Sequence, residues 1–126
     1  MARLKALRVS LIVVGLLFTF GLAGMMIFSP VGWTWQPRQH EYEQMILGFY
    51  AVLGLFLLRA ARNPLRHRSL IWFTVWSSIV HAAVTAIHAL RDPAESAQLA
   101  GNVPVLLLVA IVLAVLIPKL GGAWRL

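Results

Sequence analysis

The chain has 126 residues, of which 60% are hydrophobic and 12% are charged, and its mean hydropathy of +0.82 is too high for a soluble domain of this size, which could not bury that much apolar surface. The formal charge of +7, from 11 Lys and Arg against 4 acidic residues, does not indicate a nucleic-acid partner, because most basic residues stand at the ends of apolar runs, where they meet water and lipid headgroups. The chain contains no cysteine, which excludes a disulfide, a thiolate nucleophile and cysteine ligation of iron–sulfur clusters.

The lipid bilayer is therefore the expected partner, and two of four predicted membrane spans lie in the first half of the chain. Residues 9–28 form a run of 20 residues without a charge. As a helix this run is long enough to cross a hydrocarbon core of roughly 30 Å, and Pro30 ends it. The second span is predicted over residues 42–61, where Glu43 and Arg59 stand near the helix ends and can extend their charged groups to water.

The third and fourth spans differ in polarity. Residues 69–90 lack Asp, Glu, Lys and Arg but carry six hydroxyl or imidazole side chains, whereas residues 103–117 have an apolar interior. The six polar side chains are Thr74, Ser77, Ser78, His81, Thr85 and His88. Between these spans, Asp92 and Glu95 have capping-box spacing around Pro93, which predicts a short interfacial helix over residues 93–99. The predicted fold class is all-α: an integral membrane four-helix bundle that forms a single transmembrane domain over residues 1–126.

Lys and Arg are distributed unequally between the two sides of this bundle. One side holds nine of them: Arg3, Lys5, Arg8, Arg59, Arg62, Arg66, Arg68, Lys119 and Arg125. The other side holds Arg38 and Arg91 together with all four acidic residues. The positive-inside rule therefore predicts a bacterial inner-membrane protein with both termini cytoplasmic, in the N-in/C-in orientation. The first apolar run is longer than that of an ordinary signal peptide, which favours a retained anchor over a cleaved leader.

Small residues predict where the helices approach one another closely. Gly15 and Thr19 lie one turn apart on the first span, and Gly48, Ala51 and Gly54 follow the second. Lipid removes most of the hydrophobic drive for helix association, so close backbone approach and interhelical hydrogen bonds must hold the bundle together. These residues are the predicted contact surfaces.

Polar side chains on the second and third spans predict a candidate site. His81 and His88 are seven residues apart on the third span, hence on nearly one face, and Glu43 and Tyr50 have the same separation on the second. If these two helices are neighbours, as their short connection indicates, Glu43 lies level with His88 and Tyr50 with His81. The predicted ligand-binding set is Glu43, Tyr50, Ser78, His81, Thr85 and His88. These two predicted pairs, Glu43 with His88 and Tyr50 with His81, could serve as a ligand pocket, a proton path or a structural clamp.

The sequence allows more than one kind of chemistry at this candidate site. Glu43 and His81 are the candidate catalytic residues if the protein is an acid–base enzyme acting on a lipid or quinone-like substrate. Outward-facing imidazole and carboxylate groups at His40, His88 and Asp92 are the candidate metal ligands, although they form no dense ligand motif. Haem is disfavoured because the two histidines of the membrane spans share one helix. No nucleophile elbow surrounds the serines, and the sequence identifies no cofactor.

The segments 62–82, 40–43 and 48–58 together resemble a family of small bacterial four-helix membrane proteins known only as a domain of unknown function. This resemblance covers most of the chain and implies the same topology, but it implies no activity, ligand or catalytic residue. The leading hypothesis is a non-enzymatic inner-membrane protein that binds a hydrophobic small molecule or serves as an accessory subunit of a larger membrane complex or homo-oligomer. The alternatives are the membrane-embedded acid–base enzyme and an outward-facing metal-binding membrane protein.

Overall fold

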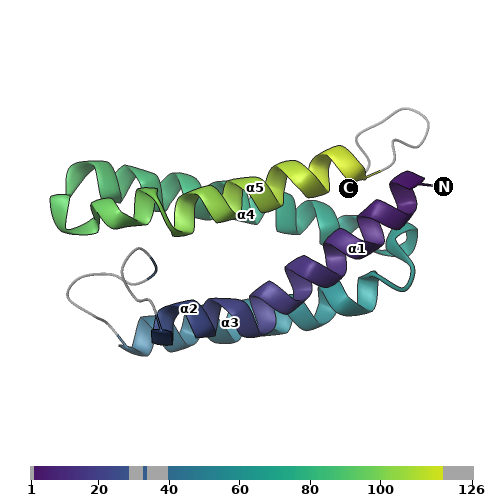
Figure 1. Ribbon diagram of the computed structural model, residues 1–126, viewed down its shortest axis with the longest axis horizontal. Helices are drawn as coiled ribbons and strands as arrows, with labels where there is room; N and C mark the ends of the chain where they lie inside the picture. The colour runs from purple at the N-terminus through teal and green to yellow at the C-terminus, as the bar shows by residue number, and fades with distance from the viewer. Residues whose placement is uncertain (1, 29–32, 34–39, 118–126) are drawn as a thin grey trace.

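A computed structural model describes residues 2–28, 33 and 40–117 of the chain, and within them every regular element is a helix (Figure 1). The elements are α1 (Ala2–Leu16), a π-helical turn η1 (Leu17–Gly21), α2 (Leu22–Phe28), α3 (His40–Ala60), a 3₁₀ turn η2 (Pro64–His67), α4 (Arg68–Arg91), a 3₁₀ helix η3 (Pro93–Leu99) and α5 (Asn102–Leu116). The predicted all-α class is confirmed, and a 3₁₀ helix occupies residues 93–99, where the sequence predicted a short interfacial helix.

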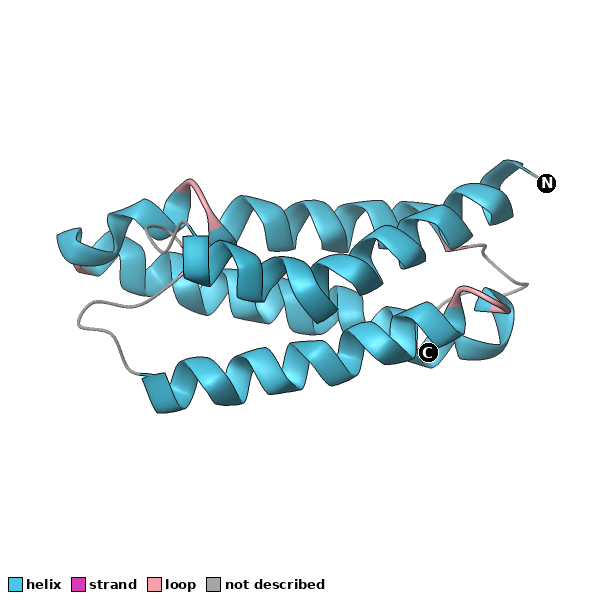
Figure 2. Ribbon diagram, turned by 60° about the horizontal axis from the view of Figure 1, so that its bottom comes forward, coloured by secondary structure: helices cyan, strands magenta, loops and turns pink. Residues whose placement is uncertain are grey.

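Four helical segments of the described chain are long and apolar enough to cross a membrane. They are Ala2–Phe28, Glu41–Ala60, Pro64–Arg91 and Pro93–Leu116, close to the spans predicted from the sequence. The first starts earlier than predicted because the helix continues through the basic amino end. The segments run broadly along the long axis of the molecule (Figure 2), and α1 is inclined to it (Figure 1).

The helices associate in two pairs. The first segment packs on α3, and α4 packs on α5, while α1 also reaches α5. In Figure 1, α4 and α5 lie along one side, α2 and α3 along the other, and α1 crosses between them. The second and third spans, which their short connection indicated as neighbours, do contact one another, but α3 and α4 meet in only a few places. Their connection is short, but the close contacts of each helix are with a different partner.

The pairing of the first segment with α3 depends on two glycines. A Cβ added at Gly54 would lie 2.6 Å from the carbonyl oxygen of Gly15, and one added at Gly15 would lie 2.9 Å from the carbonyl oxygen of Gly54. The two backbones touch here, as small residues permit in membrane helices. Gly48, also predicted to lie in such a contact, faces open space. The contact surface predicted on the second span is therefore correct for Gly54 and wrong for Gly48.

A π-helical turn lies directly at this contact. The hydroxyl of Thr19 donates a hydrogen bond to the carbonyl oxygen of Gly15 at 2.7 Å, within the region where the helical hydrogen-bond pattern widens over Leu17–Gly21. π-Helical turns are rare and are found mostly as single turns within α-helices. The turn contains Phe18, whose side chain is fully buried, so the irregularity lies beside the core of the bundle.

The outside of the bundle is apolar, as a lipid-facing surface requires. Large hydrophobic side chains are exposed on every long helix, among them Ile27, Phe56, Val80 and Leu108, which are 72%, 54%, 59% and 62% exposed. A protein surrounded by water rarely exposes apolar surface this extensive. The core is correspondingly small and lies along the inner faces of the helices.

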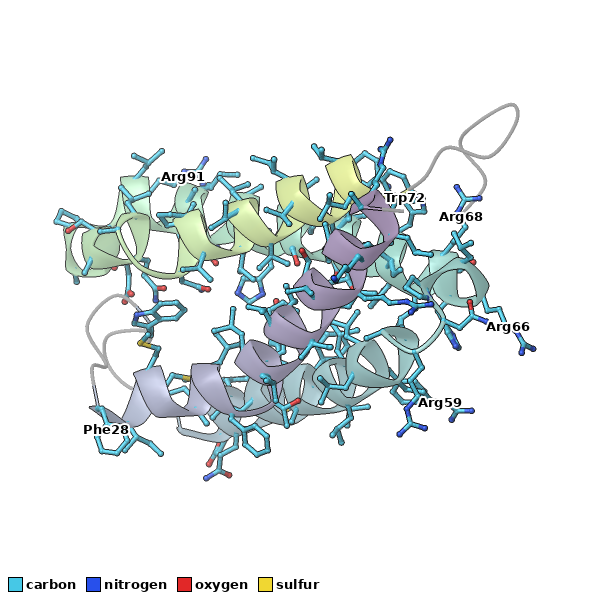
Figure 3. All side chains as sticks on the ribbon, turned by 45° about the vertical axis from the view of Figure 1, so that its right-hand side comes forward. Phe28, Arg59, Arg66, Arg68, Trp72 and Arg91 are labelled. Atoms are coloured by element: carbon cyan, nitrogen blue, oxygen red, sulfur yellow. The ribbon has the colours of Figure 1, made fainter. Side chains whose placement is uncertain are left out.

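Charged residues gather at the two ends of the bundle. Arg59, Arg66 and Arg68 lie at one end, here called the basic end, and Arg91 lies at the other (Figure 3). At the basic end the guanidinium of Arg3 donates to the carbonyl oxygens of Leu116 at 3.3 Å and Ile117 at 3.2 Å and also to that of Val115. These carbonyls at the C-terminus of α5 have no helical partner of their own, so Arg3 joins the start of α1 to the end of α5. Arg38, Lys119 and Arg125 lie outside the described residues.

Candidate functional site

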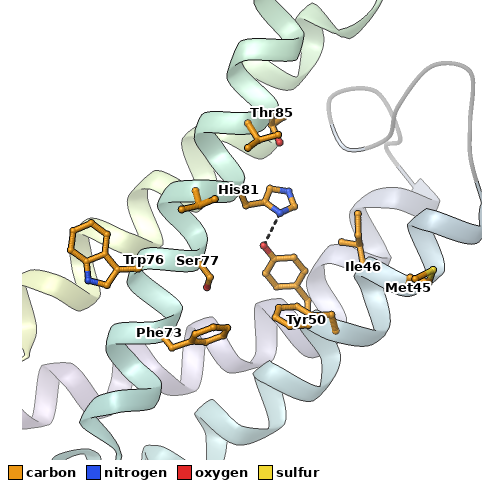
Figure 4. Close-up of a pocket in the computed structure, with 11 residues that line it drawn as sticks. Met45, Ile46, Tyr50, Phe73, Trp76, Ser77, His81 and Thr85 are labelled. Atoms are coloured by element: carbon orange, nitrogen blue, oxygen red, sulfur yellow. Dashed lines mark hydrogen bonds between the residues drawn. The ribbon is translucent and has the colours of Figure 1, made fainter. Parts of the chain in front are cut away.

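The centre of the candidate site is a hydrogen-bonded pair from two helices. The hydroxyl of Tyr50 on α3 lies 3.1 Å from Nδ1 of His81 on α4, and the two side chains point toward one another across the space between the helices (Figure 4). The deeper of the two predicted pairs, Tyr50 with His81, is therefore present. It forms although α3 and α4 diverge, because both side chains are long enough to meet.

A third polar side chain, Asn102 on α5, completes the group. Its Nδ2 lies 3.4 Å from Nε2 of His81. An amide nitrogen only donates, so with the amide in this orientation Nε2 accepts, and Nδ1 carries the ring hydrogen and donates it to the Tyr50 oxygen. The phenol hydrogen is then left for another acceptor. Asn102 is the first residue of α5, directly after the N-cap residue Gly101, and it was not among the site residues predicted from the sequence.

Aromatic packing fixes the tyrosine ring. Phe18, from the π-helical turn, meets the Tyr50 ring edge-on at a centroid distance of 4.9 Å, and Phe49 does so at 5.6 Å. The His81 ring completes the cluster at 5.6 Å. Edge-to-face contacts at these distances are favourable, so the phenol group is held in place from several sides and only its hydroxyl edge is left to interact.

One face of this pair opens into a large groove between α3 and α4. The groove has a volume of about 780 Å³, and its walls are apolar apart from Tyr50, Ser77, His81 and Thr85. The complete lining is Met45, Ile46, Phe49, Tyr50, Phe73, Trp76, Ser77, Val80, His81, Val84 and Thr85. Several of these side chains, including Trp76 at 53% and Val80 at 59%, are exposed. The groove therefore opens on the surface that faces lipid if the helices span a membrane.

The other face of the pair borders a small cavity of about 40 Å³ inside the bundle. Its polar lining consists of Glu43, Tyr50, His81 and Asn102, of which Glu43 is only 5% exposed. Apolar side chains make up the rest: Leu22, Met26, Trp33, Ile46, Leu47 and Leu106. Four long segments of the chain thus meet around this cavity, which the sequence did not predict.

Of the remaining predicted ligand-binding residues, only Thr85 lines one of these two spaces. Thr85 lines the groove. Ser78 is 1% exposed and lies on the buried face of α4, where its hydroxyl has no hydrogen-bond partner among the described residues; it lines neither cavity. His88 is exposed and also lines neither. The outer pairing of Glu43 with His88 therefore stays a prediction.

The described part of the chain contains no assembled metal site. Residues 2–28, 33 and 40–117 contain no group of three His, Cys, Asp or Glu side chains placed to hold one ion. The carboxylate of Asp92 instead accepts a hydrogen bond from the backbone N–H of Ala94 at 3.0 Å and caps η3. The side chain of His40 lies outside the described residues.

The fold and the site describe a small helical protein with four segments able to cross a membrane and a polar group at its centre. Residues 1–123 match the model of a family of unknown function, DUF6632, and the chain belongs to that family. No curated protein and no solved structure matches the chain. The family supplies no activity, so any function must be argued from the site itself.

Proposed function

We propose that this chain is a multi-pass protein of the bacterial inner membrane, with both termini cytoplasmic, that binds an amphipathic small molecule in the groove between α3 and α4. The ligand has a hydrocarbon body, which lies along the apolar walls, and an oxygen-bearing head, which reaches Tyr50 and His81. The position of Arg59, Arg66 and Arg68 together at one end of the bundle supports the orientation, because an excess of Lys and Arg favours the cytoplasmic side.

The observation that carries the proposal is the Tyr50–His81 pair at the floor of an apolar groove. Polar groups are costly in the hydrocarbon region unless they are hydrogen-bonded. A purely structural pair would be sealed between helices, whereas this one borders a groove of about 780 Å³, a volume typical of small-molecule sites. Ligand sites commonly combine apolar walls with a few polar groups that orient the ligand.

Binding is favoured over acid–base catalysis by the position of Glu43. Its carboxylate lines the inner cavity and not the groove, so a molecule in the groove meets Tyr50 and His81 and has no direct contact with the proposed catalytic acid. An accessory role in a larger complex would use the exposed apolar faces that all the helices share. Ligand binding accounts for the particular residues at the groove floor.

Native mass spectrometry of the purified protein tests this proposal. The protein in mild detergent is incubated separately with decylubiquinone and with oleic acid, which both join an oxygen-bearing head to a hydrocarbon tail. One bound molecule of at least one probe is expected. Val84→Trp places an indole in the groove and should weaken binding strongly, whereas Ile111→Trp, on an exposed face of α5, should preserve it. Failure of both probes to bind, or equal binding by both variants, would refute the proposal.

A further inference from the structure

Three residues, Ile46, Tyr50 and His81, line both the groove and the inner cavity. The hydrogen-bonded pair Tyr50–His81 therefore forms a wall between the groove on one side and the inner cavity, which Glu43 lines, on the other. Resting on the proposed function, we propose that the inner cavity holds water that links Glu43 to this wall, so that a carbonyl-type head binds in the groove more tightly when the Glu43 carboxyl is protonated.

The inner cavity has the size and lining that buried water requires. A single water needs about 10–15 Å³ and two to four polar partners, and the cavity offers about 40 Å³. A carboxyl, a phenol, an imidazole and an amide border it, contributed by Glu43, Tyr50, His81 and Asn102. An apolar cavity of this size would stay dry, but one with four polar groups favours one or more bridging waters.

The directions of the hydrogen bonds provide the coupling. Nε2 of His81 has one lone pair, which the Asn102 amide approaches, so the water that accepts from a protonated carboxyl donates instead to the Tyr50 oxygen, which also borders this cavity. Nδ1–H of His81 donates to the same phenol oxygen, and the phenol O–H is directed toward the groove. Each donor in such a chain polarises the next and strengthens it. An acceptor in the groove therefore gains most when the chain begins at a protonated Glu43.

This chain of donors also defines the class of head group. An oxygen that only accepts, such as a quinone or ester carbonyl, takes the phenol hydrogen. An alcohol or phenol head can also accept this hydrogen, but its own O–H then needs an acceptor, and a largely apolar groove offers few. The site is thus inferred to prefer carbonyl heads, with proton binding at Glu43 and ligand binding in the groove favouring each other reciprocally.

Few other titratable groups face Glu43 across the cavity. Its own helix supplies Tyr50 and α4 supplies His81, whereas α2 contributes Leu22 and Met26, and α5 contributes Asn102 and Leu106, none of which titrates. Trp33 completes the described lining without a titratable group. Among the described residues that line the cavity, Glu43, Tyr50 and His81 are thus the groups that titrate, and a variant can distinguish a pH effect of Glu43 from one of the pair.

The test is the affinity of the full-length protein for decylubiquinone, whose carbonyl head does not titrate, across the range in which carboxyl and imidazole groups titrate. The wild type should bind decylubiquinone at least about fivefold more tightly at the acidic end than at the basic end, since fivefold is near the lower limit of typical coupling between two sites. Glu43→Gln should remove the pH dependence and retain binding. Glu41→Gln removes the same charge from an exposed position on the same helix and should behave as wild type.

A second variant changes the cavity without changing any titratable group. Met26→Phe fills the space that the proposed water occupies, so it should weaken the pH dependence while the groove still binds decylubiquinone. An unchanged pH dependence in Glu43→Gln would assign the effect to His81 and overturn the inference, although the proposed function would stand. Loss of decylubiquinone binding in the wild type, with oleic acid still bound, would overturn the preference for a carbonyl head. Loss of both probes would refute the proposed function itself.

Discussion

Gly54→Ala should loosen the bundle at the contact between the first segment and α3. The added methyl group would lie 2.6 Å from the Gly15 carbonyl oxygen, whereas ordinary contact begins at 3.4 Å, so the backbones must separate by about 0.8 Å. The methyl group would also meet the backbone nitrogen and the hydroxyl of Thr19. Backbone atoms cannot turn aside as a flexible side chain can, and overpacking of this kind costs about 1–3 kcal/mol.

The same displacement should reach the site. Phe18 lies in the π-helical turn beside this contact and packs on the Tyr50 ring, so moving the first segment away from α3 removes part of the support of the phenol. Gly54→Ala should therefore weaken binding in the groove although residue 54 lines neither cavity.

Unfolding in mixed micelles by titration with sodium dodecyl sulfate measures the free energy. Gly48→Ala is the matched control, because it makes the same change on the same helix at a position where nothing lies within 4 Å. There the gain in helix propensity, about 0.5–1 kcal/mol in water, should leave the protein as stable as wild type or slightly more so. Equal stability of the two alanine variants would show that the reasoning about this contact is wrong.

Two further predictions concern the ends of the bundle. Arg3→Gln should lower the free energy of unfolding by about 1 kcal/mol, because the carbonyls at the end of α5 lose a charged donor. Lys5→Gln removes the same charge from an exposed neighbour and should have a smaller effect in the sodium dodecyl sulfate titration. Asp92→Ala should destabilise η3 by about 1 kcal/mol through loss of its cap, and amide hydrogen exchange over residues 93–99 should become faster. Asp92→Asn keeps an acceptor oxygen and should preserve the protection of these amides. Equal exchange in the two variants would contradict the role of the cap.

The sequence by itself determined the membrane-like helices and most of their ends, although the first begins earlier than predicted. Long uncharged runs, Pro30 and the Asp92 cap are local signals, and they act within a few residues whatever the helices touch. The separation of seven residues between Glu43 and Tyr50, repeated between His81 and His88, was likewise enough to bring Tyr50 and His81 into consideration as a pair.

Only the tertiary structure decided which helices pair and what surrounds the polar residues. Lipid covers any apolar face equally well, so hydropathy does not distinguish one neighbour from another, and the choice depends on close fit at positions such as Gly15 and Gly54. That fit separates α3 from α4, opens the groove between them and brings Asn102 from a distant part of the chain to His81. Nothing in the residues around Asn102 could have indicated that contact, because it exists only once α5 packs on α4.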